Sequence, residues 1–200
     1  ISIKKSKENI PMVYYSNLNV SDENLNVYRT TKLHTRKKSL ASLVMRRSIA
    51  GCTMIFNKQM WEKIASVNIT DDMLKRGHDS FILSLCYAIK GSVICDSSAY
   101  IKYRQHTSNT SGSSNGVYQR IKKESKNLLN KKGTEPAIAK SILENWGSSI
   151  GEEEKRQLKL IKNSGKSIRA RLIIFCSNKF STGNLLLTIL GKIKALFGLL

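Results

Sequence analysis

One stretch decides how the first half of the chain folds: Gly51-Cys52-Thr53-Met54-Ile55-Phe56-Asn57 (residues 51–57). The glycine follows a basic segment of helical pattern, and the apolar run after it predicts a short strand over residues 54–57. Because glycine lets another group approach the backbone closely, Gly51 and its neighbour Thr53 are candidates for lining a ligand pocket. A tight turn before a buried strand would produce the same pattern, and this alternative stays open.

A second cluster, His78-Asp79, stands where a polar loop (residues 71–77) meets an apolar segment (residues 81–88) of helical character. A carboxylate in the first turn of a helix is stabilised as the anion, and it can accept a proton from a substrate. Asp79 is therefore a candidate general base, and the alternative is that it only caps the helix. His78 would orient Asp79, contact a substrate, or simply pack.

A third cluster, Tyr103-Arg104-Gln105-His106, ends a strand-like segment and opens a loop rich in Ser, Thr, Asn and Gly. His106 is a candidate metal ligand, because imidazole can complete a divalent site made of carboxylate and phosphate oxygens. An exposed loop histidine is the alternative. Arg104 is a candidate for binding a diphosphate, since guanidinium binds phosphate oxygens bidentately. The rival interpretation is a surface charge at a strand end.

In this order and spacing, the three clusters resemble the C-terminal half of a family 2 inverting glycosyltransferase with the GT-A fold, rhamnosyltransferase-like members above all. The resemblance covers residues 13–112. It implies that Asp79 is the catalytic base and that His106 helps to hold a metal and diphosphate. It also implies that the substrates are contacted by Gly51, Cys52, Thr53, His78 and Arg104.

The same resemblance implies a reaction. A sugar, with rhamnose as one candidate, would pass from a nucleotide-diphosphate donor to a lipid-linked saccharide in bacterial O-antigen or capsule biosynthesis. A divalent metal, Mg or Mn, would serve the intact enzyme. The D-x-D metal motif of this family is absent from the sequence, and Asp71-Asp72 follow Gly51 instead of preceding it. We therefore expect an α/β protein in which residues 1–112 form the acceptor-side half of a longer GT-A domain, inactive alone.

Residues 113–200 are expected to form a basic helical extension. The pattern predicts helices over 117–132, from Thr134 onward, and over 152–163. The last stretch, residues 185–200, interrupts an apolar run with lysines, which is typical of a helix lying in the interface of an anionic membrane. Docking on the missing half of the enzyme, or pairing with another chain, are the alternatives.

The formal net charge of +20 favours an anionic partner. A basic nucleic-acid-binding protein, or a membrane-associated protein without catalysis, is therefore the alternative function. Because the sequence contains no RNP-like aromatic pattern, zinc finger or recognisable helix-turn-helix, we expect no nucleic acid. We expect a cytoplasmic protein peripheral to the inner membrane, since scattered cysteines suit a reducing compartment and no apolar run reaches the roughly 18 residues of a spanning helix.

The residue types also allow two other kinds of site to be considered. A thiol-protease triad of Cys52, His78 and Asp79 lacks a glycine-rich oxyanion signature, and neighbouring side chains such as those of His78 and Asp79 rarely face each other. A zinc site built from His34, His78, His106 and cysteines matches no ligand spacing of known zinc sites.

Overall fold

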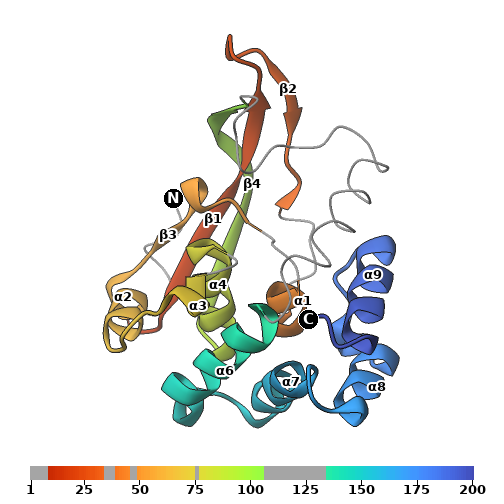
Figure 1. Ribbon diagram of the computed structural model, residues 1–200. Coiled ribbons are helices and arrows are strands. Elements are labelled where there is room, and N and C mark those ends of the chain that lie inside the picture. Colours follow the sequence, from red (N-terminus) through yellow and green to blue (C-terminus); the bar gives the residue numbers. More distant parts are fainter. Residues whose placement is uncertain (1–8, 34–38, 46–48, 75–76, 106–133) are drawn as a thin grey trace.

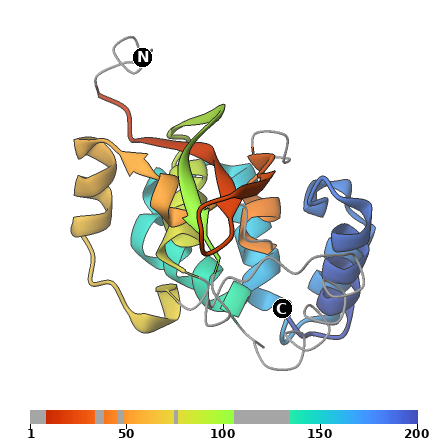
Figure 2. The same cartoon turned by 90° about the horizontal axis from the view of Figure 1, so that it is seen from above.

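The computed structural model describes residues 9–33, 39–45, 49–74, 77–105 and 134–200 (Figure 1). They form a mixed α/β fold, as expected from the sequence. A small sheet stands beside a group of helices, and the C-terminal helices cover the lower end of the molecule in this view. Seen from above, the strands lie between α2 on one side and α9 on the other (Figure 2).

Strand β1 (Met12–Ser21) is the centre of the sheet. It pairs in parallel with β4 (Ser92–Arg104) along one edge. Its other edge pairs antiparallel with β2 (Val27–Thr30) at one end and with β3 (Ile55–Phe56) at the other. Parallel neighbours need a long crossover, and here the chain from β2 to α4 provides it. The strand expected over residues 54–57 is confirmed as β3. The sequence also predicts a turn at residues 21–24 and a short return strand over residues 27–31, which is confirmed as β2.

Strand β4 differs from the sequence-based expectation. The sequence predicts two strands, over residues 92–96 and 99–103, but β4 is one continuous strand and the prediction is wrong. The register along β1 moves from Ser16 opposite Asp96 to Asn17 opposite Ala99, which leaves an irregularity at the two serines between. The side-chain amide of Asn17 donates to the carbonyl of Ser97 at 2.7 Å, so the irregular backbone is paired and β4 continues past it.

The helices follow local signals in the sequence. The sequence also predicts helices over residues 40–45 and 58–65, and they are confirmed as α1 and α2. The helix predicted over 152–163 is confirmed as α7, whereas the one expected over 117–132 lies outside the described residues. The helical elements are α1 (Leu40–Met45), η3 (Gly51–Thr53), α2 (Lys58–Ala65), α3 (Asp71–Leu74), α4 (His78–Ala88), α6 (Thr134–Trp146), η4 (Gly147–Ser149), α7 (Glu152–Asn163), α8 (Ile168–Cys176), η5 (Asn178–Phe180) and α9 (Leu185–Leu196).

One hydrophobic core joins the sheet to the C-terminal helices. Buried side chains of β1, α1 and α4 belong to the same cluster as those of α6, α7, α8 and α9. At this junction the rings of Phe81 and Trp146 lie 6.0 Å apart, and the indole N–H of Trp146 donates to the carbonyl of Lys63 at 3.1 Å. The expected domain boundary at residues 112–113 falls outside the described residues.

Candidate functional site

The first turn of α4 presents His78 and Asp79. The N-cap of this helix is Gly77, whose φ of 98° is a conformation that favours glycine, and the amide of Phe81 donates to its carbonyl at 3.2 Å. Asp79 therefore does not occupy the N-cap. It lies in the first turn, where the positive end of the helix dipole favours a carboxylate.

The Asp79 carboxylate is partly exposed, and its Oδ1 accepts a hydrogen bond from the amide of Ser80 at 2.7 Å. Ser80 itself is only 5% exposed, yet its hydroxyl has no hydrogen-bond partner among the described residues. A buried hydroxyl without a partner costs free energy.

Gly51 of η3 lies directly against this helix start, although 27 residues separate it from His78. A Cβ atom added at Gly51 would lie 2.8 Å from His78 Nε2 and 3.4 Å from Asp79 Cβ. A side chain at position 51 would therefore displace the exposed imidazole of His78, which shows that η3 and the start of α4 are in contact. The two sequence clusters therefore form one surface.

Cys52 and Thr53 complete η3 in different ways. Cys52 is exposed with a free thiol, and partial desolvation, followed by the negative charge of Asp79, raises the pKa of that thiol. Since the thiolate is the nucleophile, this environment works against the thiol-protease alternative. Thr53 is buried, and its hydroxyl donates to the carbonyl of Ala50 at 2.9 Å. That bond closes the turn, and a contact of Thr53 with a sugar stays a prediction.

Asn57, at the end of the quoted stretch, has a structural role that the sequence analysis did not assign. Its Oδ1 accepts from the amides of Met12 at 2.9 Å and Met60 at 3.1 Å, and its Nδ2 donates to the carbonyl of Ile10 at 2.8 Å. It therefore caps α2 and holds the beginning of β1. The preference of asparagine for N-cap positions was the available signal.

The third sequence cluster lies elsewhere on the sheet. Arg104 is exposed and is the last residue of β4, in register with Ser21 at the end of β1, whereas α4 runs beside the lower part of these strands (Figure 1). His106 lies outside the described residues. Of the seven predicted site residues, the structure brings Gly51, Cys52, His78 and Asp79 together, and Thr53 stands in the same turn.

A metal site is not formed by the described residues. Within them, no group of three or more His, Cys, Asp or Glu side chains is arranged to hold an ion. The expected divalent metal stays a prediction about a longer enzyme, and we derive no chemical step from it.

A second polar cluster lies on β1 and β4 and was not predicted. Asp96 accepts hydrogen bonds from the hydroxyls of Tyr14 at 2.9 Å and Tyr100 at 3.1 Å, and from the amide of Ser98 at 2.8 Å. The amide and then the Tyr14 hydroxyl lower the pKa of the Asp96 carboxyl. Burial, together with the bond to Asp96 and its charge, raises the pKa of Tyr14 to about 12. These residues brace the irregular part of β4.

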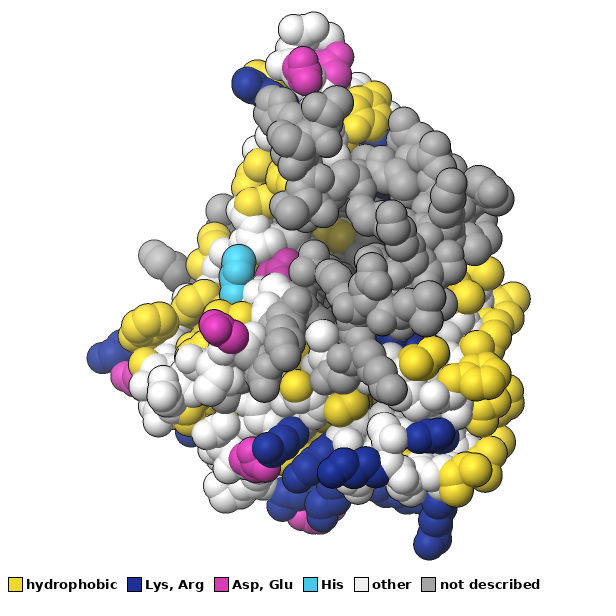
Figure 3. Space-filling model, in the orientation of Figure 1, with side chains coloured by type: hydrophobic (Ala, Val, Ile, Leu, Met, Phe, Trp, Pro, Cys, Tyr) yellow, Lys and Arg dark blue, Asp and Glu magenta, His cyan; other side chains and the backbone are white. Residues whose placement is uncertain are grey.

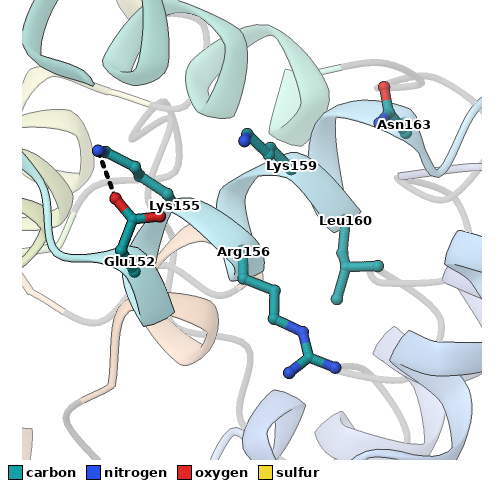
Figure 4. Close-up of a pocket in the computed structure, with 6 residues that line it drawn as sticks. All are labelled: Glu152, Lys155, Arg156, Lys159, Leu160 and Asn163. Atoms are coloured by element: carbon teal, nitrogen blue, oxygen red, sulfur yellow. Dashed lines mark hydrogen bonds and ion pairs between the residues drawn. The ribbon is translucent and has the colours of Figure 1, made fainter. Parts of the chain in front are cut away.

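A shallow pocket of about 250 Å³ lies away from Asp79, along α7. Its lining residues are Glu152, Lys155, Arg156, Lys159, Leu160 and Asn163 (Figure 4). Lys155 turns towards Glu152, and their charged groups are 2.7 Å apart, whereas Arg156 extends in another direction. The pocket contains no predicted site residue. Its Lys and Arg side chains add to the positive charge of the C-terminal helices.

In the part of the chain that the structure describes, every helix is too short or too polar to cross a lipid bilayer. Comparison of the chain with protein-family models, with curated proteins and with solved structures found no match.

Proposed function

We propose that the chain is the acceptor-side part of an inverting glycosyltransferase of GT-A fold and that Asp79 is its general base. One observation supports this most: two motifs separated by 27 residues, Gly51-Cys52 and His78-Asp79, meet around a partly exposed carboxylate. The mixed α/β architecture is compatible with this proposal.

In the proposed reaction, the carboxylate of Asp79 takes the proton of an acceptor hydroxyl while the hydroxyl oxygen forms a bond to the anomeric carbon of the donor sugar. The bond from that carbon to the diphosphate oxygen breaks, and the nucleoside diphosphate leaves with its electron pair. Protonated Asp79 then returns the proton to solvent. Gly51, Cys52, Thr53 and His78 would border the sugars, with Arg104 and His106 assigned to the diphosphate. A sugar such as rhamnose and a lipid-linked saccharide acceptor remain part of the proposal.

The test compares Asp79→Asn with the wild type in the longer polypeptide that carries this chain together with a nucleotide-binding half. Transfer of labelled sugar from a nucleotide donor to the lipid-extractable fraction is measured. General-base catalysis typically contributes about a hundred- to ten-thousand-fold, so activity should fall by that factor while the thermal unfolding midpoint stays unchanged.

The matched control is Asp71→Asn, which removes an exposed carboxylate from the start of α3 and should leave transfer near the wild-type rate. If the Asp79→Asn variant transferred sugar at nearly the wild-type rate, Asp79 would not be the general base. Equal losses in the two variants would point to a general effect of charge instead.

A further inference from the structure

The outer side of α8 and α9 is covered by large hydrophobic side chains. Ile168, Leu172 and Phe175 on α8, Ile189 and Ile193 on α9, and Phe197 at the C-cap of α9 are between 40% and 72% exposed. Spacings of three and four residues place each set on one side of its helix. We call these six residues the α8–α9 apolar surface. Figure 3 shows hydrophobic side chains gathered along the edge of the molecule that the two helices form.

The inner side of α9 is unusual because it carries small and charged residues. A Cβ added at Gly191 would lie 3.1 Å from Met45 Cε of α1, and Ala195 is completely buried. Lys194 pairs with Glu135 of α6 at 2.8 Å, and the two side chains are 12% and 3% exposed. A surface helix ordinarily buries its large apolar side chains. Here α9 is held by its other side, so the large side chains face outward.

The C-terminal segment around this surface is uniformly basic. Residues 155–200 include ten Lys and Arg and no Asp or Glu. Four of these cations pair with glutamates that precede residue 155, namely Lys155, Lys162, Lys179 and Lys194. Lys166 and Arg169 are exposed beside the beginning of α8, and Lys192 lies on α9. Arg156 and Lys159 of the α7 pocket are also exposed (Figure 4). In Figure 3, Lys and Arg side chains border the hydrophobic edge at its lower end.

An apolar centre with a cationic border fits one partner chemistry, the surface of an anionic lipid bilayer. A second copy of the chain fits less well, because a symmetric dimer would bring two copies of the same cationic surface together. Nucleic acid also fits less well, since strand binding uses aromatic stacking, whereas this surface is mainly aliphatic.

We propose that the α8–α9 apolar surface binds peripherally to anionic membranes. Both helices lie along the interface, their apolar side chains enter the headgroup and acyl boundary, and the surrounding lysines and arginines contact lipid phosphates. The sequence alone suggested only residues 185–200, and the structure adds α8. The proposal goes beyond glycosyl transfer and does not depend on it, because its readout is binding.

The experiment measures flotation of the 200-residue protein with vesicles of equal phosphatidylglycerol and phosphatidylcholine, and with phosphatidylcholine alone. Two variants remove apolar side chains, Leu172→Gln/Phe175→Gln on α8 and Ile189→Gln/Ile193→Gln on α9. Each should lower partitioning to anionic vesicles at least about tenfold, because each withdraws two large apolar side chains from the membrane. Circular dichroism and denaturant unfolding verify that both variants fold.

The matched control is Val27→Gln/Tyr28→Gln on β2, where the exposed fractions of 44% and 50% are comparable. It should bind vesicles as the wild type does. Lys166→Gln/Arg169→Gln should weaken binding to anionic vesicles, and added salt should act in the same direction.

The proposal would be overturned if the folded α8 variant bound vesicles as the wild type does, or if the wild type bound neutral and anionic vesicles equally. It would also be overturned if the protein bound no vesicles and instead formed a dimer that the glutamine substitutions disrupt, or bound oligonucleotides but no vesicles.

Discussion

Single polar side chains stabilise the sheet at its least regular points. Asn17 is 2% exposed and uses both ends of its amide, donating to Ser97 O at 2.7 Å and accepting from the amide of Leu33 at 2.6 Å. Asp96 accepts hydrogen bonds from two tyrosine hydroxyls and one backbone amide. The bonds from Asn17 to Ser97 and from Ser98 to Asp96 satisfy backbone groups that the irregular strand pairing leaves free.

The pair Tyr14–Asp96 predicts a pH dependence of stability. The pKa of Tyr14 is raised from 10.0 to about 12, so its contribution is fully present below pH 10 and is lost as pH rises towards 12. The pKa of Asp96 is lowered from 3.8, so its contribution is present above that pH and is lost as pH falls below it. Denaturant unfolding at a series of pH values measures the loss of stability at acid and at alkaline pH. The ultraviolet absorbance of tyrosinate follows the ionisation of the tyrosines.

Burial also raises the pKa of Tyr87 to about 12, so Tyr14→Phe should remove one of two tyrosine ionisations near pH 12 and leave that of Tyr87. Asp96→Asn should flatten the loss of stability at acid pH and bring the pKa of Tyr14 closer to its ordinary value. Tyr28→Phe on the exposed strand β2 is the control and should leave both features in place. An unchanged alkaline titration in Asp96→Asn would show that the hydrogen bond does not control Tyr14.

At the scale of elements, α9 is attached by a buried ion pair. Lys194→Met keeps the length of the side chain but removes the ammonium group that pairs with the buried carboxylate of Glu135, and breaking a buried pair typically costs about 3–5 kcal/mol. Urea unfolding should show a loss of that size. Lys155→Met is the matched control, because its partner Glu152 is 86% exposed, and it should cost less than about 1 kcal/mol. Equal losses would contradict this account of α9.

For some helices, the local sequence pattern was sufficient to predict where the helix begins and ends. The boundaries of α2 and α7 follow from nearby signals, an asparagine N-cap for α2 and three glutamates in the first turn of α7. The single strand β4 was not predictable in this way. Ser97 and Ser98 look like a break in the sequence, and only the pairing with Asn17 in β1 keeps the strand continuous.

At the scale of the whole molecule, the shared core predicts one cooperative unfolding transition. Phe81 of α4 packs on Trp146 of α6, and Leu158 of α7 is completely buried in the same cluster. Tryptophan fluorescence and far-ultraviolet circular dichroism should therefore give coincident denaturant curves. Leu158→Ala should shift both curves together, with a loss of about 2–5 kcal/mol. Two separate transitions would show that the C-terminal helices unfold as an independent unit.

By itself, the sequence determined the α/β class, most helix positions, the excess of positive charge and the residues of the candidate site, because these depend on residue type and short-range spacing. Only the tertiary structure decided that η3 lies against the start of α4, that β4 continues past its irregularity, and that α9 turns its large apolar side chains outward. Each depends on contacts between residues far apart in the chain: Gly51 with His78, Asn17 with Ser97, and Lys194 with Glu135. The periodicity of a single segment carries no record of which distant surface will pack against it.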